Sequence, residues 1–136
     1  LRLPCHMSYT VSVIDKASAT ATVFLNPDRP ARVVPDRVAT NHQGHIEWPE
    51  YAAVSCTIVR HAELVRLVTD KYQTLDSVTA RFVQPPLRAY DGDRRTATLY
   101  TTAYRPHRRH VDVIWPDASW RLSFGNFPNK TIRITL

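Results

Sequence analysis

Four consecutive polar side chains, Thr40-Asn41-His42-Gln43, are the residues of this sequence best suited to chemistry. They follow a valine-containing stretch, residues 32–39, that predicts a short strand, so Asn41 is expected at the end of that strand. A carboxamide fixed there can aim two N–H donors into a cleft, where they would stabilise the oxyanion formed during acyl transfer. Asn and Gly also favour turns, and on local grounds a polar turn before a helix is the favoured explanation.

Histidines offer a second kind of chemistry. His42 and His45 flank Gly44, but a metal site there would need a third ligand, which the neighbouring sequence does not provide. We therefore expect no metal and no other cofactor.

The two cysteines, Cys5 and Cys56, have neither metal-like spacing nor a companion pair. Cleavage after Pro4 would expose Cys5 as an N-terminal nucleophile, but proline is an unusual residue at a scissile bond, so this role is not favoured. Cys56 falls within a predicted helix and is expected to be a small buried side chain.

Basic residues dominate the charge, which is formally +6 with a pI of about 9.7. They cluster at Arg94-Arg95 and in the segment 105–110, Arg-Pro-His-Arg-Arg-His. Such a patch could attract phosphate or an anionic substrate. Because segment 105–110 is expected at a hairpin tip and carries no nucleic-acid motif or interleaved aromatic residue, a solvated turn is favoured.

Strands are predicted at both ends of the chain, where apolar and polar residues alternate. Segment 105–110 would then form the tip of the second of two hairpins. The expected strands cover residues 9–14, 19–25, 32–39, 98–104, 110–115, 120–124 and 131–136.

Helices are predicted between these strands, because the apolar residues there recur at three- and four-residue steps. One helix should run from about Glu50 to Thr69, after Pro49. A shorter one should begin after the N-cap Thr74 and end before Pro85-Pro86. The order predicts a single α+β domain over residues 1–136, mainly antiparallel sheet with two helices on one face. The other face of the sheet is apolar and needs a cover.

Several short motifs, taken in order, resemble the penicillin acyltransferase-like cysteine peptidases. These form the acyl-coenzyme A:6-aminopenicillanic acid acyltransferase family, within the N-terminal-nucleophile (Ntn) hydrolases. The likeness runs from about His6 to Phe127 and corresponds to the C-terminal portion of such a protein. The motifs are His-Met-Ser-Tyr at 6–9, Val-Ser-Val-Ile-Asp at 11–15, Ala-Thr-Val-Phe-Leu at 21–25, Pro-Asp-Arg at 27–29, Ala-Thr-Asn-His-Gln at 39–43, Leu-Tyr-Thr at 99–101, Tyr-Arg-Pro at 104–106 and Ile-Trp-Pro at 114–116.

The resemblance implies part of an αββα sandwich that cleaves or transfers an acyl group at an amide or thioester. It implies that Asn41 donates to the oxyanion hole, while His42 either holds Asn41 or simply packs. The family's cysteine nucleophile lies upstream of His6, outside this chain, so the chain alone is expected to be inactive. The related bile-salt hydrolases carry an active-site Arg just before the position of Trp115. Since this chain has Ile114 there, their substrate clamp is not carried over.

Two other functions stay open: an inert binding or structural module of the same fold, and a basic domain that binds nucleic acid. The expected partners are a small-molecule amide or acyl thioester, and either the N-terminal portion of the enzyme or a partner chain that covers the sheet. No apolar run is long enough for a membrane span, and we expect a cytoplasmic protein. The chain begins Leu-Arg-Leu-Pro without an initiator Met or signal peptide, which suggests a processed chain or a fragment.

Overall fold

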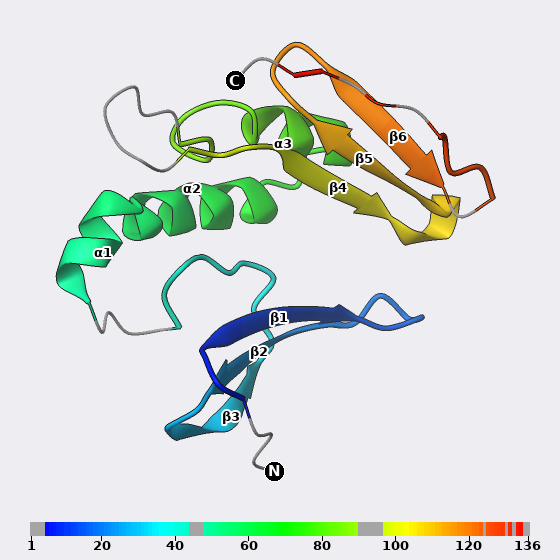
Figure 1. Cartoon of the computed structure of the whole chain (residues 1–136). Helices are drawn as coiled ribbons and strands as arrows, with labels where there is room; N and C mark the ends of the chain where they lie inside the picture. Colours follow the sequence, from blue (N-terminus) through cyan, green and yellow to red (C-terminus); the bar gives the residue numbers. More distant parts are fainter. Residues whose placement is uncertain are drawn as a thin grey trace. The chain divides into compact units, whose positions relative to one another are not determined.

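Each of two units, Leu1–Lys71 and Tyr72–Leu136, carries one three-stranded antiparallel sheet and helical segments (Figure 1). The structure is a computed structural model. It describes residues 5–43, 48–89, 97–123, 125–129, 131 and 133–134. The predicted α+β class and antiparallel pairing are confirmed.

The first sheet is a meander in the order β1-β2-β3. Its strands are β1 (Tyr9–Ile14), β2 (Thr20–Asn26) and β3 (Arg29–Val34). Asp15 closes the first turn, because its carboxylate accepts the N–H of Ala19 at 2.8 Å. The first two predicted strands are confirmed.

The third strand was predicted at the wrong place. It begins at Arg29, because Asn26 Oδ1 accepts the N–H of Asp28 at 2.9 Å and so makes a tight turn. It ends at Val34, since Pro35 has no N–H for the ladder. Asn41 therefore lies in a bend seven residues beyond β3, not at a strand end.

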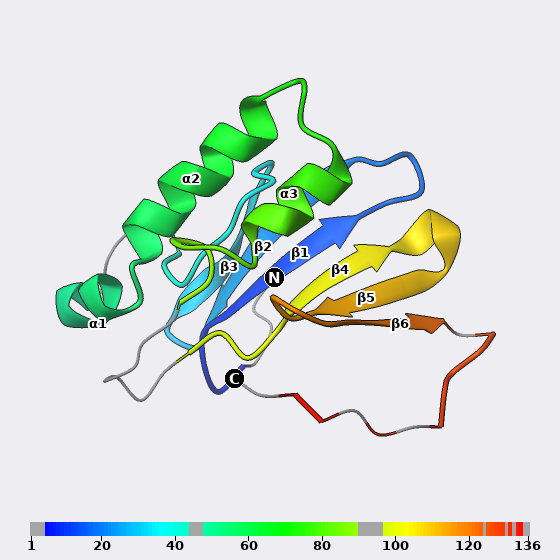
Figure 2. The same ribbon diagram turned by 90° about the horizontal axis from the view of Figure 1, so that it is seen from above.

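The predicted helix over 50–69 is in fact two helices, α1 (Pro49–Val54) and α2 (Thr57–Thr69), which differ in direction (Figure 2). The chain turns between them at Cys56, whose left-handed backbone (φ 50°, ψ 30°) interrupts the helical hydrogen-bond pattern. Cys56 is exposed, so its predicted burial was wrong. The buried residues of α2 are Thr57, Leu64 and Leu67, whereas Val65 and Val68 are exposed.

The second unit contains the short helix α3 (Leu75–Arg81) and the sheet β4-β5-β6. Thr74 is the predicted N-cap: its hydroxyl accepts the N–H of Ser77, and the Ser77 hydroxyl accepts the N–H of Thr74. The sheet comprises β4 (Thr101–Arg105), β5 (His110–Ile114) and β6 (Ser119–Ser123).

The predicted hairpin tip lies between β4 and β5, where a single 3-10 turn, η1 (Pro106–Arg108), is followed by Arg109 in the left-handed region. The first strand of this hairpin is shorter than predicted, because it begins at Thr101. Of the strand predicted over 131–136, the described residues Thr131, Arg133 and Ile134 are not in a strand, and the others lie outside the described residues, as do Arg94 and Arg95.

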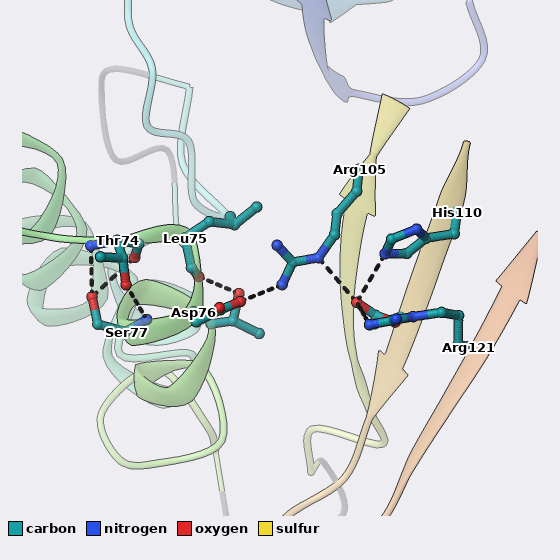
Figure 3. Close-up of polar contacts among 9 residues, drawn as sticks. Thr74, Leu75, Asp76, Ser77, Arg105, His110 and Arg121 are labelled. Atoms are coloured by element: carbon teal, nitrogen blue, oxygen red, sulfur yellow. Dashed lines mark hydrogen bonds and ion pairs between the residues drawn. The ribbon is translucent and has the colours of Figure 1, made fainter. Parts of the chain in front are cut away.

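Asp112 is the buried charge of the second sheet, with 7% of its surface exposed. Its carboxylate accepts hydrogen bonds from Arg121 Nε at 2.7 Å and from Arg105 Nε at 3.0 Å (Figure 3). Arg105 also donates to Asp76 at 2.6 Å and thereby joins the first turn of α3 to the sheet. The hydrogen bond from Arg121, supported by that from Arg105, lowers the pKa of Asp112 although burial opposes the shift.

Replacing Asp112 with Asn should lower the free energy of unfolding at pH 7 by about 1.5–3 kcal/mol, because two charged donors lose their acceptor charge. The folded-state pKa lies below the unfolded value, so this stabilisation is complete above about pH 4 and is lost as the pH falls further. Urea denaturation between pH 3 and pH 7, followed by circular dichroism, measures both effects. The exposed Asp117→Asn variant is the matched control, and equal stability of the two variants would contradict the role of Asp112.

Candidate functional site

A cavity of about 370 Å³ in the first unit contains the polar segment that the sequence singled out. It lies among the start of β1, the loop after β3, α1 and the first residue of α2. Its lining residues are Ser8, Thr10, Thr40, Asn41, His42, Gln43, Trp48, Tyr51, Ala52 and Thr57.

The side chain of Asn41 is held at both ends of its amide group. Arg60 Nη1 donates to Oδ1 at 3.2 Å, and Nδ2 donates to the hydroxyl of Tyr51 at 3.1 Å. Because a guanidinium can only donate, Arg60 fixes the oxygen on its own side and the nitrogen toward Tyr51. The second N–H of Nδ2 has no partner among the residues that the structure describes.

His42 fastens the same loop to the beginning of α2. Its Nδ1 lies 3.1 Å from the Thr40 hydroxyl and 2.9 Å from the hydroxyl of Thr57, which is 1% exposed. The ring of His61 lies 5.4 Å away, centre to centre. Burial lowers the pKa of His42, and the neighbouring His61 lowers it further. His42 is therefore a neutral ring at neutral pH and can accept one hydroxyl hydrogen or donate its own.

Gln43 fastens the loop to the sheet. Its Nε2 donates to the carbonyls of Tyr9 at 2.9 Å and Leu25 at 3.1 Å, two residues that face each other in β1 and β2. The backbone carbonyl of Gln43 accepts a hydrogen bond from the Arg32 guanidinium at 2.7 Å. Nearer the start of the loop, the carbonyl of Asp36 accepts a hydrogen bond at 2.8 Å from the buried hydroxyl of Thr22 in β2. Asn41 thus stands on a loop whose two sides are both anchored.

The residues that hold Asn41 and His42 were not predicted from the sequence. Tyr51, Thr57 and Arg60 come from helices, and the bend that brings them to the loop leaves no periodic signal. One signal was available: Thr57, Arg60 and His61 are spaced three and four residues apart, so they share one face of α2. A polar face at the start of an otherwise apolar helix could have marked a site.

The other candidate residues are placed away from this cavity or are not described. Cys5 is free and half-buried, and it does not line the cavity. His45 lies outside the described residues, so the metal site considered for His42 and His45 stays untested. Within the described ranges, no group of three His, Cys, Asp or Glu residues could hold a metal ion. Ile114 ends β5 in the second unit.

No helix in the described part of the chain has the length and apolar character needed to cross a bilayer.

A match to a protein family shows to which family the chain belongs. The model of the family described as acyl-coenzyme A:6-aminopenicillanic acid acyl-transferase matches residues 2–120. The chain belongs to this family. Searches of the curated proteins and of the solved structures give no match. The matched residues include every residue that lines the cavity of the first unit, and also β4 and β5. The polar loop therefore lies within the part of the chain that matches this acyltransferase, Ntn-hydrolase-like family.

Titration of His42 should give a pKa below the ordinary value of about 6.5 when its ring resonances are followed by NMR. The His61→Gln variant should move the His42 pKa upward only in part, because burial is the larger cause of the shift. Since the unfolded chain takes up a proton at this residue more readily, His42 should make the fold less stable as the pH falls below about 6.5. A His42 pKa at or above that value would contradict the buried, neutral ring.

Proposed function

We propose that this chain supplies the oxyanion-hole amide of a cysteine Ntn amidohydrolase or acyltransferase. The observation that carries the proposal is that hydrogen bonds to Arg60 and Tyr51 fix the side chain of Asn41. Asn41 lines a cavity of suitable size, within the residues that match the family. Asn41 also belongs to the Thr-Asn-His motif in which the resembled enzymes place their oxyanion donor. The substrate is a small-molecule amide or acyl thioester, as the acyl-coenzyme A in the family's name suggests.

The reaction begins when a cysteine sulfur attacks the substrate carbonyl carbon, so that the carbonyl oxygen takes up the negative charge. The free N–H of Asn41 then donates to this oxygen. A donor fixed in advance needs no reorganisation at the moment of reaction, which is why such donors stabilise the intermediate by a few kcal/mol. Collapse of the intermediate expels the amine or thiol and leaves a thioester, which water hydrolyses or an amine aminolyses.

The base for the attack is the α-amino group of the nucleophilic cysteine itself, because its pKa near 8 lets it take a proton at neutral pH. In the resembled family that cysteine lies upstream of the segment that corresponds to His6. The proposal therefore gives this chain the oxyanion donor and part of the pocket wall. The nucleophile comes from the N-terminal portion of the enzyme.

Arg60 and Tyr51 act as positioning residues. A positive charge donating to Oδ1 draws electron density from the amide nitrogen, so the free N–H of Asn41 becomes a stronger donor. The same contact prevents the amide from flipping its oxygen, which would repel an oxyanion, into the cavity. His42 and Gln43 hold the backbone on either side and so limit the movement of Asn41.

The rest of the cavity suits a small acyl or amide group. Trp48, 66% exposed, and Ala52 provide apolar surface, while Ser8 and Thr10 provide polar surface on the side of β1. A volume of about 370 Å³ lies at the lower end of the range typical of small-molecule sites.

A covering partner fits the exposure of the sheet. All six residues of β1 are exposed, and they include Val11, Val13 and Ile14. Apolar side chains gathered on one edge strand are typical of an interface. We assign this surface to the N-terminal portion of the enzyme or to a partner chain.

In the active enzyme that contains this chain, Asn41→Ala should slow acylation by about 10²–10³-fold, the usual effect of removing one oxyanion donor. KM should change much less, because the donor acts on the charged intermediate. Asn41→Asp should be at least as damaging, since a carboxylate repels the oxyanion. Pre-steady-state kinetics measures the rate and the melting temperature checks folding. A folded Asn41→Ala variant with near-full activity would make Asn41 a turn residue.

Arg60→Met should lower kcat about tenfold with little change in KM, a loss of about 1.4 kcal/mol of transition-state stabilisation. The double variant Asn41→Ala/Arg60→Met should be no slower than Asn41→Ala alone, because Arg60 acts only through Asn41. Arg66→Met is the matched control, since Arg66 lies on the same helix but pairs with Glu63. Additive losses in the double variant would show that Arg60 acts independently of Asn41.

A further inference from the structure

A second cavity, of about 480 Å³, lies in the second unit beside the tip of the β4–β5 hairpin. Tyr104, Val111 and Leu122 form part of its wall, and they are paired across β4, β5 and β6, so they share one face of the sheet. Pro106 and Phe127 add further apolar surface. Tyr104 is 73% exposed and Phe127 is 72% exposed, so both aromatic residues can contact a ligand.

Most of the positive charge beside this cavity is already neutralised within the unit. Arg105 lines the cavity, but its guanidinium is bound to Asp76 and Asp112. The ring of His110 also lies beside Asp112, with Nε2 at 3.6 Å from its carboxylate. The guanidinium of Arg105 is therefore poorly available to a ligand.

Arg109 also lines the cavity. Its side chain has no hydrogen-bond or ion-pair partner among the residues that the structure describes. Its backbone is fixed, because its N–H donates to the carbonyl of Pro106 at 3.0 Å and its φ is 55°. A guanidinium without a partner among the described residues thus extends from a fixed backbone position at a largely apolar cavity.

We infer that this cavity binds a small monocarboxylate with an apolar body, the body against Tyr104, Leu122 and Phe127 and the carboxylate on Arg109. A single guanidinium matches a single carboxylate, because its fork can donate two parallel hydrogen bonds. The apolar walls favour a ligand that also has an apolar part to bury against them. The volume of the cavity lies within the range of small-molecule sites. The site belongs to the second unit and does not depend on the function proposed for Asn41.

Decanoate is a suitable probe, with decanol as the uncharged ligand of the same chain length. Calorimetric titration of the full chain should show decanoate binding, and Arg109→Gln should weaken it about tenfold. The matched control is Arg108→Gln, which removes the neighbouring charge of the tip without touching this cavity and should change the affinity by less than about twofold. Decanol should bind more weakly than decanoate and should be insensitive to Arg109→Gln. NMR shifts caused by decanoate should centre on Val111 and Leu122.

A second pair of variants guards against a loss of folding. Arg109→Lys keeps the charge but not the fork, so it should restore part of the decanoate affinity lost in Arg109→Gln. Leu122→Asn should weaken decanoate and decanol together. The inference is overturned if decanoate does not bind, if Arg108→Gln and Arg109→Gln weaken it equally, or if the NMR shifts centre on Asn41 in the first unit.

Discussion

The loop after β3 depends on hydrogen bonds made where water is excluded. Thr22 and Thr57 are each 1% exposed, and their hydroxyls bind the carbonyl of Asp36 and the ring of His42. A buried hydroxyl without a partner costs about 1–3 kcal/mol, so this loop cannot leave its position without a large penalty. The loop that carries Asn41 is thus held by groups on either side of this residue. Asn41 itself stays exposed and can meet a ligand.

Polar anchoring also organises the second unit, where Asp112 receives two arginines and Arg105 reaches the first turn of α3. The two clusters differ in their chemistry. The first uses neutral groups around a histidine whose pKa is lowered, and the second uses full charges around an aspartate whose pKa is lowered. Both arrangements weaken in acid, because the unfolded chain binds protons that the folded units exclude. The fold is therefore expected to be most stable near neutral pH.

The family relationship and the geometry bear on different parts of the function. The family match supports acyl transfer chemistry and covers both units as far as residue 120. The role proposed for Asn41 rests on its amide orientation, which is imposed by Arg60, a residue that can only donate. The partner proposed to cover the sheet rests on the exposure of β1. The apolar cavity with Arg109 lies outside this reasoning and offers a separate surface for a small anion.

By itself the sequence determined the elements whose signals are local. Alternation predicted β1, β2 and β5, the Thr74 N-cap predicted the start of α3, and the ordered motifs predicted the family. Only the tertiary structure decided that the helix breaks at Cys56 and which residues hold Asn41. A residue with a left-handed backbone does not change the spacing of apolar residues, so this spacing cannot predict it. Contacts between a loop and a helix depend on how the chain folds between them. The chemistry of Asn41 could thus be proposed from its neighbours in sequence, whereas its orientation required its neighbours in space.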